Sequence, residues 1–119
     1  MATKLKPILP SLREKKRFVA FEIISNDRIS NARAVSESIQ DTSLRFLGEL
    51  GTGRMGIRVL EDKYNPGVQK GIVRINHKHA DHMRAVLALI KEIDNTRVLV
   101  RSIGVSGILK KAEHKYIAG

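Results

Sequence analysis

The order in which strand-like and helix-like segments follow one another is the feature that most restricts the fold of this sequence. Residues 18–25 are rich in β-forming side chains and end at a turn signal, Asn26-Asp27. Ser30 then precedes a segment with helical periodicity, and serine caps helices well. The apolar positions of this predicted helix are Ala32, Val35, Ile39, Phe46, Leu47 and Leu50. We expect the helix to end at Gly48 or Gly51, because the glycine-rich segment gives the backbone too much freedom to continue.

The second half of the chain repeats this alternation. Residues 56–61 and 68–76 are predicted strands, and the turn Asn65-Pro66-Gly67 between them makes the two a hairpin. A second helix follows and is expected to end at Asp94-Asn95. Its apolar positions, at offsets of three and four, are Met83, Val86, Leu87, Ile90 and Ile93. Residues 97–103 are the last predicted strand.

The predicted order is therefore strand, helix, strand, strand, helix, strand. This is the split βαβ pattern of an α+β, ferredoxin-like or RRM-like sandwich (βαββαβ). In such a fold both helices cover one face of a four-stranded antiparallel sheet, and the other face stays open. We divide the chain into a basic N-terminal arm (1–17), the sandwich (18–105) and a short basic C-terminal helix or tail (106–119).

Composition restricts the class of function. The chain has 119 residues, a net charge of +10, a hydrophobic fraction of 42% and no cysteine. One domain with its own core is expected at this length. Disulfides, thiolate metal sites and a cysteine nucleophile are excluded, which suits a reducing cytoplasm. The longest apolar runs, 19–24 and 85–90, are far shorter than the ~20 residues of a membrane span. We therefore expect a cytoplasmic protein whose partner is a polyanion, either nucleic acid or an anionic membrane surface.

Strand alternation predicts two different faces of the sheet. The side chains expected to face the helices are Val19, Phe21, Ile23, Ile57, Val59, Val73, Ile75, Val98 and Val100. Those expected on the open face are Ala20, Glu22, Arg58, Leu60, Ile72, Arg74, Leu99 and Arg101. Three strands thus place an arginine beside an aliphatic residue, a surface that suits RNA phosphates or a partner protein, or is simply solvated.

Base stacking on this face is not expected. In RNA-binding domains of this topology aromatic residues on strands one and three stack the bases. Here Ile72 and Arg74 occupy the third-strand positions, while Phe18 and Phe21 alternate to opposite faces. Contact through phosphate charge and RNA shape is therefore the expected mode.

Candidate chemistry is sparse. His79 and His82 have a spacing that suits a metal, and His77 lies close by, but no cysteine or inward carboxylate completes the shell. We therefore expect no metal site and no catalytic residue, and a solvated helix entrance is the simpler interpretation. A small nuclease that uses His79 or His82 as acid and base is an alternative.

Three segments offer cations to a polyanion. Arg54 stands at the tip of the glycine-rich crossover and is a reasonable phosphate contact. The segment Gly104–Gly107 ahead of Lys110 and Lys111 is either an anion site at a helix start or a simple cap with solvated lysines. The sharpest cluster is 12–17, with four cations in five residues, for which a solvated charge run is the usual explanation.

Several segments together resemble a known family. In chain order they are Leu9–Phe21, Leu47–Gly51, Gly71–Arg74, Lys78–His79, Arg84–Leu87, Glu92–Ile93, Arg97–Val98, Arg101, Gly104–Gly107 and Lys110. The pattern is similar to archaeal ribonuclease P protein component 2, whose eukaryotic relative is the Pop-five subunit. The match is loosest over 24–43 and 55–66, and Phe18 stands where the family commonly has tyrosine.

The resemblance implies a non-catalytic, RNA-binding subunit of the ribonucleoprotein that removes the 5′ leader of precursor tRNA. The RNA subunit would carry out the endoribonuclease chemistry with Mg²⁺, and the protein itself would bind no cofactor. A TIM-barrel-like protein component 3 would be the partner, in a heterodimer or heterotetramer. By resemblance, RNA contact falls on Arg13, Lys15, Lys16 and Arg17, and next on Arg74, Ser106 and Lys110.

The full predicted RNA-binding set combines both lines of argument. It consists of Arg13, Lys15, Lys16, Arg17, Arg54, Arg58, Arg74, Arg101, Ser106, Lys110 and Lys111. A ribosome-associated ferredoxin-like protein and a pure protein-interaction module are further alternatives. The first would sediment with ribosomal subunits, and the second would have no affinity for RNA.

Overall fold

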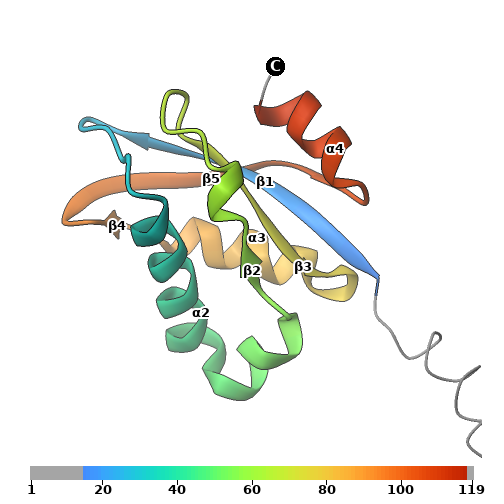
Figure 1. Ribbon diagram of the computed structural model, residues 1–119. Coiled ribbons are helices and arrows are strands. Elements are labelled where there is room, and N and C mark those ends of the chain that lie inside the picture. Colours follow the sequence, from blue (N-terminus) through green and yellow to red (C-terminus); the bar gives the residue numbers. More distant parts are fainter. Residues whose placement is uncertain (1–14, 118–119) are drawn as a thin grey trace, which may run out of the picture.

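A computed structural model describes residues 15–117 of the chain, and Figure 1 shows its helices and strands. Most of the predicted N-terminal arm, Arg13 included, lies outside the described residues. The strands are β1 (Lys16–Ser25), β2 (Arg58–Val59), β3 (Lys70–Asn76), β4 (Glu92–Ile93) and β5 (Thr96–Ser106). The helices are α2 (Ala32–Met55), α3 (Ala80–Leu89) and α4 (Leu109–Ala112). The structure also contains two 3-10 turns, η1 (Glu61–Lys63) and η2 (His77–His79), and a π-helical segment, η3 (Glu113–Ile117).

The strands form one antiparallel sheet in the order β2-β3-β1-β5-β4. The α+β class and the antiparallel sheet are confirmed, but the described residues hold five strands rather than four. The additional strand β4 arises because α3 ends at Leu89, earlier than predicted. Asp94 and Asn95 both have positive φ, 52° and 61°, and so form the tight turn that returns β4 to β5.

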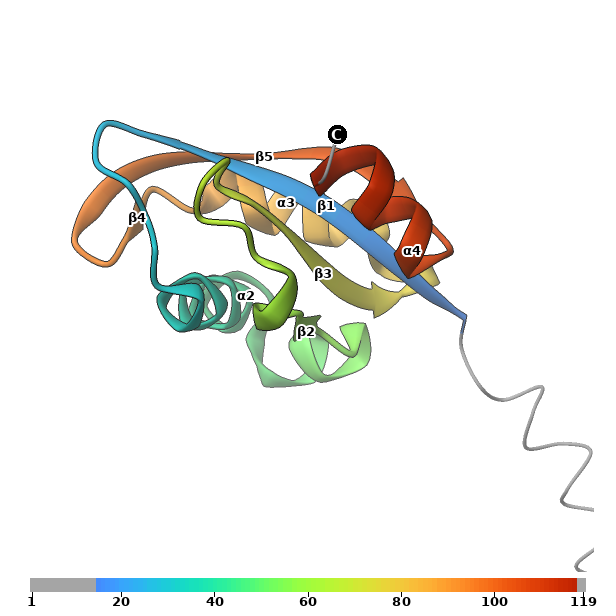
Figure 2. The ribbon, with the colours of Figure 1, turned by 45° about the horizontal axis from the view of Figure 1, so that its top comes forward.

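The helices α2 and α3 cover one face of the sheet, as Figure 2 shows. All nine side chains predicted to face the helices are buried or partly buried in the hydrophobic core beneath them. Met83, Val86 and Leu87 complete the core from α3. The alternation therefore assigned the inner face of the sheet correctly.

The first helix differs from its prediction in its cap, its end and its buried stripe. The cap is Asn31, whose Oδ1 accepts hydrogen bonds from the backbone N–H groups of residues 33 and 34, in place of Ser30. At Gly48 the backbone leaves helical geometry (φ 71°), but the helix resumes and ends only at Gly56 (φ 60°). The kink changes the phase of the helix after Gly48, where Leu50 is 71% exposed, and Phe46, which precedes the kink, is 53% exposed as well.

Two predicted strands have different lengths in the structure. The second shrinks to Arg58–Val59, since the chain turns into η1 directly after Leu60 donates its N–H to the Ile72 carbonyl (3.0 Å). The last extends to Ser106, and a register shift opposite Ala20 and Phe21 inserts one extra residue into it. This bulge places Gly104 opposite Ala20 and Ser106 opposite Phe18.

The second face of the sheet is only partly open, which corrects the expectation from the fold class: Arg58, Leu99 and Arg101 are exposed there, but the region around Ala20 is covered. Figure 2 shows α4 and the segment after it lying across β5 and β1, on the side opposite to α2 and α3. Tyr116 packs so closely on Gly104 that a Cβ there would lie 2.1 Å from its ring. Beneath this helix Ala20 and Ile72 have no exposed surface. The tail predicted from residue 106 is thus a packed layer, and its helix starts at Leu109.

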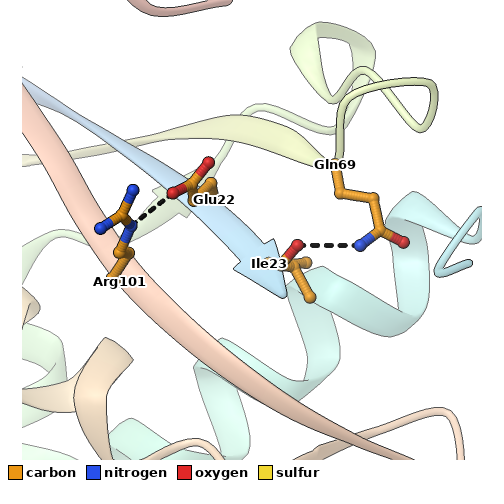
Figure 3. Close-up of polar contacts among 4 residues, drawn as sticks. All are labelled: Glu22, Ile23, Gln69 and Arg101. Carbon is orange, nitrogen blue, oxygen red and sulfur yellow. Dashed lines mark hydrogen bonds and ion pairs between the residues drawn. The ribbon is translucent and has the colours of Figure 1, made fainter. Parts of the chain in front are cut away.

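Hydrogen bonds from Gln69 fasten the far end of β1 to the loop that follows it. Gln69, at φ 54°, donates from Nε2 to the carbonyl of Ile23 (2.8 Å), as Figure 3 shows, and accepts at Oε1 from the N–H of Ile29. The hydroxyl of Tyr64 donates to the Ile29 carbonyl (2.6 Å), and burial raises the pKa of that phenol.

Within residues 15–117 no helix is both long and apolar enough to cross a membrane.

Candidate nucleic-acid interface

Three strands meet at the end of the sheet where β1 begins. Antiparallel pairing sets Lys16 opposite Asn76 at the end of β3, and Phe18 opposite Ser106 at the end of β5. The helix α4, which carries Lys110 and Lys111, starts directly beyond β5 and lies beside the first part of β1 (Figure 2). We call Lys15, Lys16, Arg17, Lys110 and Lys111 the basic end. Pairing between distant strands therefore brings two predicted clusters to one end of the sheet: the described part of 12–17, and the pair Lys110 and Lys111.

Local contacts order the cations of the basic end. The Nζ of Lys16 donates to Oδ1 of Asn76 (2.5 Å), and Nη1 of Arg17 donates to the carbonyl of Lys16 (3.0 Å). The guanidinium of Arg17 also lies against Gly107, where a Cβ would be 3.4 Å from Nη1. None of these cations pairs with a carboxylate of residues 15–117. Their charge is therefore available to an external anion.

Ser106 organises the turn into α4. Its Oγ accepts from the N–H of Ile108 (3.1 Å) and donates to the carbonyl of the same residue (3.0 Å). Ser106 therefore shapes the turn without capping the helix itself, since α4 has no side-chain cap.

Sequence reasoning missed two basic residues close to Lys110 and Lys111, namely His114 and Lys115. With Lys110 and Lys111 they line a surface cavity of about 480 Å³, and their spacing of four residues was the signal.

The backbone of Arg54, at the end of α2, is tied to the start of β1 through Asn76. Asn76 donates from Nδ2 to the Arg54 carbonyl (2.8 Å) while its Oδ1 holds Lys16. Asn76 thus links the end of α2 to the start of β1, a role that sequence reasoning did not assign to it. The long-range pairing of β1 with β3 was needed to find it.

Arg58 and Arg74 stand directly opposite each other on β2 and β3. Like charges in such a cross-strand pair are unfavourable. The Nε atom of Arg74 is also buried and has no hydrogen-bond partner within the described residues. A bound phosphate would relieve the repulsion between the two guanidinium groups, because it supplies negative charge.

Arg101 is the predicted residue that the structure does not bring to this site. Its Nε donates to Oε1 of Glu22, directly across from it on β1, as Figure 3 shows. The carboxylate of Glu22 is largely covered, at 18% exposed. Arg101 therefore has its charge compensated inside the domain.

The histidines cluster where η2 leads into α3. The Nδ1 atoms of His79 and His82 face each other at 3.3 Å, and the ring centroids are 5.3 Å apart. The two rings line a cavity of about 170 Å³ together with Leu47, Gly51, Arg54 and Met55. Nδ1 of His77 is buried and has no partner among the described residues. The described part of the chain has no group of three or more His, Cys, Asp or Glu side chains arranged to hold a metal.

The helix layer carries exposed apolar side chains of a different character. Leu44, Phe46 and Leu50 on α2 are 44%, 53% and 71% exposed, and Leu89 on α3 is 40% exposed. Phe46 and Leu89 line the same surface cavity between the two helices. Exposed apolar surface of this kind is typical of protein contacts.

The fold and the site together define a basic α+β sandwich with an unpaired group of cations at one end of its sheet. The chain belongs to the Rpp14/Pop5 family, whose family model matches residues 17–117. This confirms the family suggested by the sequence motifs.

Curated relatives match over nearly the whole chain. Ribonuclease P protein component 2 of Pyrococcus abyssi is 39% identical over 115 residues, which are 97% of this chain and 95% of the relative. The protein of the same name from Pyrococcus horikoshii is 37% identical over 99% of this chain and 96% of its own length. That of Methanosarcina acetivorans is 37% identical over 95% of this chain and 82% of its own length.

A solved structure shares the fold. A chain in the cryo-EM structure of yeast ribonuclease MRP aligns with a TM-score of 0.61 at 15% identity, over 80% of this chain and 76% of that chain. The likeness confirms the α+β architecture.

Proposed function

We propose that this chain is an RNA-binding protein subunit of ribonuclease P, which supports its RNA in removing the 5′ leader of precursor tRNA. The observation that carries the proposal is the basic end, with cations from two distant segments that meet and pair with no described carboxylate. Relatives named ribonuclease P protein component 2, matched over nearly their full length, support the same assignment.

The mode of RNA contact is through phosphates. The C-terminal helix covers Ala20 and Ile72 on the face that stacks bases in related folds, so that face offers no platform there. Exposed lysines and the opposed arginines Arg58 and Arg74 suit phosphate oxygens instead. In this proposal the RNA subunit carries out the hydrolysis with Mg²⁺, and the protein contributes no reacting group.

The test of this function is a reconstituted reaction. The protein, its cognate component 3 and the RNA subunit should process precursor tRNA at lower Mg²⁺ than the RNA alone, while the isolated protein leaves the substrate intact. Replacing Lys15, Lys16 and Arg17 by alanine should raise the Mg²⁺ requirement. Cleavage by the isolated chain would refute the proposal and favour the nuclease alternative.

A charge-matched control variant distinguishes the effect of losing the basic end from the effect of lowering the net charge. Arg28, Arg33 and Arg97 are exposed and belong to the opposite end of the domain, near the loops that follow β1 and precede β5. Their triple alanine variant loses the same charge as the basic-end variant. The proposal requires the control to keep wild-type Mg²⁺ dependence.

Component 3 is the protein partner in this proposal, and the helix layer is the surface we assign to it. The exposed apolar side chains Leu44, Phe46 and Leu50 lie on α2, whereas the cations needed for RNA lie at the sheet end. Leu50→Ser should weaken binding of component 3 in calorimetry. Leu99→Ser, at a comparably exposed position on β5, should not. Equal loss in both variants would argue against the assignment.

A further inference from the structure

The pair His79 and His82 is a pre-arranged chelating site. We propose that it binds one divalent transition-metal ion of the kind that favours imidazole, such as Zn²⁺, through the two Nδ1 atoms. These atoms face each other at 3.3 Å across one turn, where η2 meets α3. The inference stands on this geometry and does not depend on RNA binding.

The separation of the two nitrogens matches a tetrahedral ion. Zinc–imidazole bonds are about 2.0–2.1 Å long, so two such bonds at a tetrahedral angle hold their nitrogens about 3.3–3.4 Å apart. A direct N–H hydrogen bond is usually shorter, about 2.7–3.2 Å. The tilt of 41° between the rings keeps them from stacking face to face. The observed spacing of 3.3 Å therefore matches the separation that one shared tetrahedral ion would impose on the two nitrogens.

The surroundings determine how the ion would be held. Leu47 and Met55 wall the cavity, which supplies no further protein ligand within residues 15–117. Two coordination positions of a tetrahedral ion would be left for water or another oxygen donor. A metal held by two side chains exchanges easily and adds little to the fold, unlike a closed four-ligand site. Hard ions such as Mg²⁺ prefer oxygen ligands and would not compete well.

Positive charges near the histidine pair would repel a bound cation. This repulsion gives a prediction that separates cation binding from anion binding. Arg54 lines the same cavity, and the start of α3 carries the positive end of the helix dipole. Asp81, the nearby carboxylate on α3, is 95% exposed and pairs with Arg84 (3.7 Å). Removing the charge of Arg54 should therefore tighten binding of a cation, whereas it would weaken binding of an anion.

The experiment is a titration of the full, untagged chain with ZnCl₂ in a non-coordinating buffer. We expect one Zn²⁺ per chain, with affinity reduced about tenfold or more in His79→Asn and in His82→Asn, because even outer-shell changes cost 10–100-fold. Asparagine suits the N-cap position of residue 79, so that variant should fold. His114→Asn, at an exposed histidine outside the pair, is the matched control and should bind like wild type.

Two further measurements sharpen the outcome. Arg54→Ala should bind Zn²⁺ more tightly than wild type, and bound Co²⁺ should give the visible absorption typical of tetrahedral coordination. Absence of saturable Zn²⁺ binding to the folded wild-type chain would overturn the proposal and leave a hydrogen-bonded histidine pair. Binding that persists unchanged in both His79→Asn and His82→Asn would overturn it as well.

Discussion

Substitution of Gly104 by alanine should detach the C-terminal helix from the sheet. Gly104 lacks the positive φ that is found at Gly48 and Gly56, so alanine is acceptable to the backbone itself. The conflict is steric, because the new Cβ would lie 2.1–2.3 Å from two ring carbons and the hydroxyl oxygen of Tyr116. Gly104 lies on β5 opposite Ala20, and at this point β5 pairs with β1. The ring of Tyr116 must therefore move.

The magnitude follows from what the helix covers. Overpacking of this kind costs about 1–3 kcal/mol. If the helix leaves instead, Ile72 loses a burial that is now complete, which costs about 1.5–3 kcal/mol. Both routes allow a fall in the free energy of unfolding of about 1.5–3 kcal/mol. For a domain of 119 residues this lowers Tm by about 6–12 °C.

The assay is chemical denaturation of Gly104→Ala, Tyr116→Ala and the double variant. Because both substitutions disrupt one contact, the double variant should be little less stable than Tyr116→Ala alone. Additive losses, or a Gly104→Ala protein as stable as wild type, would refute the packing described here. Hydrogen exchange of the backbone amides around Ile72 should become faster in the variants that lose stability.

Other predictions concern the basic end and two local hydrogen-bonding residues. Replacing Lys15, Lys16 and Arg17 by alanine should flatten the log–log salt dependence of RNA binding by about 0.7–0.9 per lost phosphate contact, and an unchanged slope would count against phosphate contact there. Gln69→Ala should lower the free energy of unfolding by about 1–3 kcal/mol, measured in urea, because the N–H of a buried residue loses its acceptor. Asn31→Ala should cost about 1 kcal/mol through loss of the helix cap, whereas an effect at Ser30 instead would contradict the observed cap.

The sequence alone determined the order of the helices α2 and α3 and of every strand except β4, and it determined the inner face of the sheet. Both depend on periodicity among near neighbours, so Val19, Phe21 and Ile23 could be assigned to the core without a structure. The sequence also identified Lys15 to Arg17 and Lys110 as cations of interest. It did not predict that Leu50 is exposed, because one backbone kink at Gly48 changes the helix phase after it, and it did not predict the exposure of Phe46, which precedes that kink.

The tertiary structure decided which of these cations act together. Lys16 and Lys110 are 94 positions apart in the sequence. Only the pairing of β1 with β5 brings their segments to one end of the sheet. The same pairing sets Arg101 against Glu22 and compensates its charge. The extra residue in β5 places Gly104 opposite Ala20 and against Tyr116, so the C-terminal helix can cover part of the face that the fold class alone predicts to be open. Register, bulges and packing between distant segments arise from long-range contacts, which local sequence patterns do not encode.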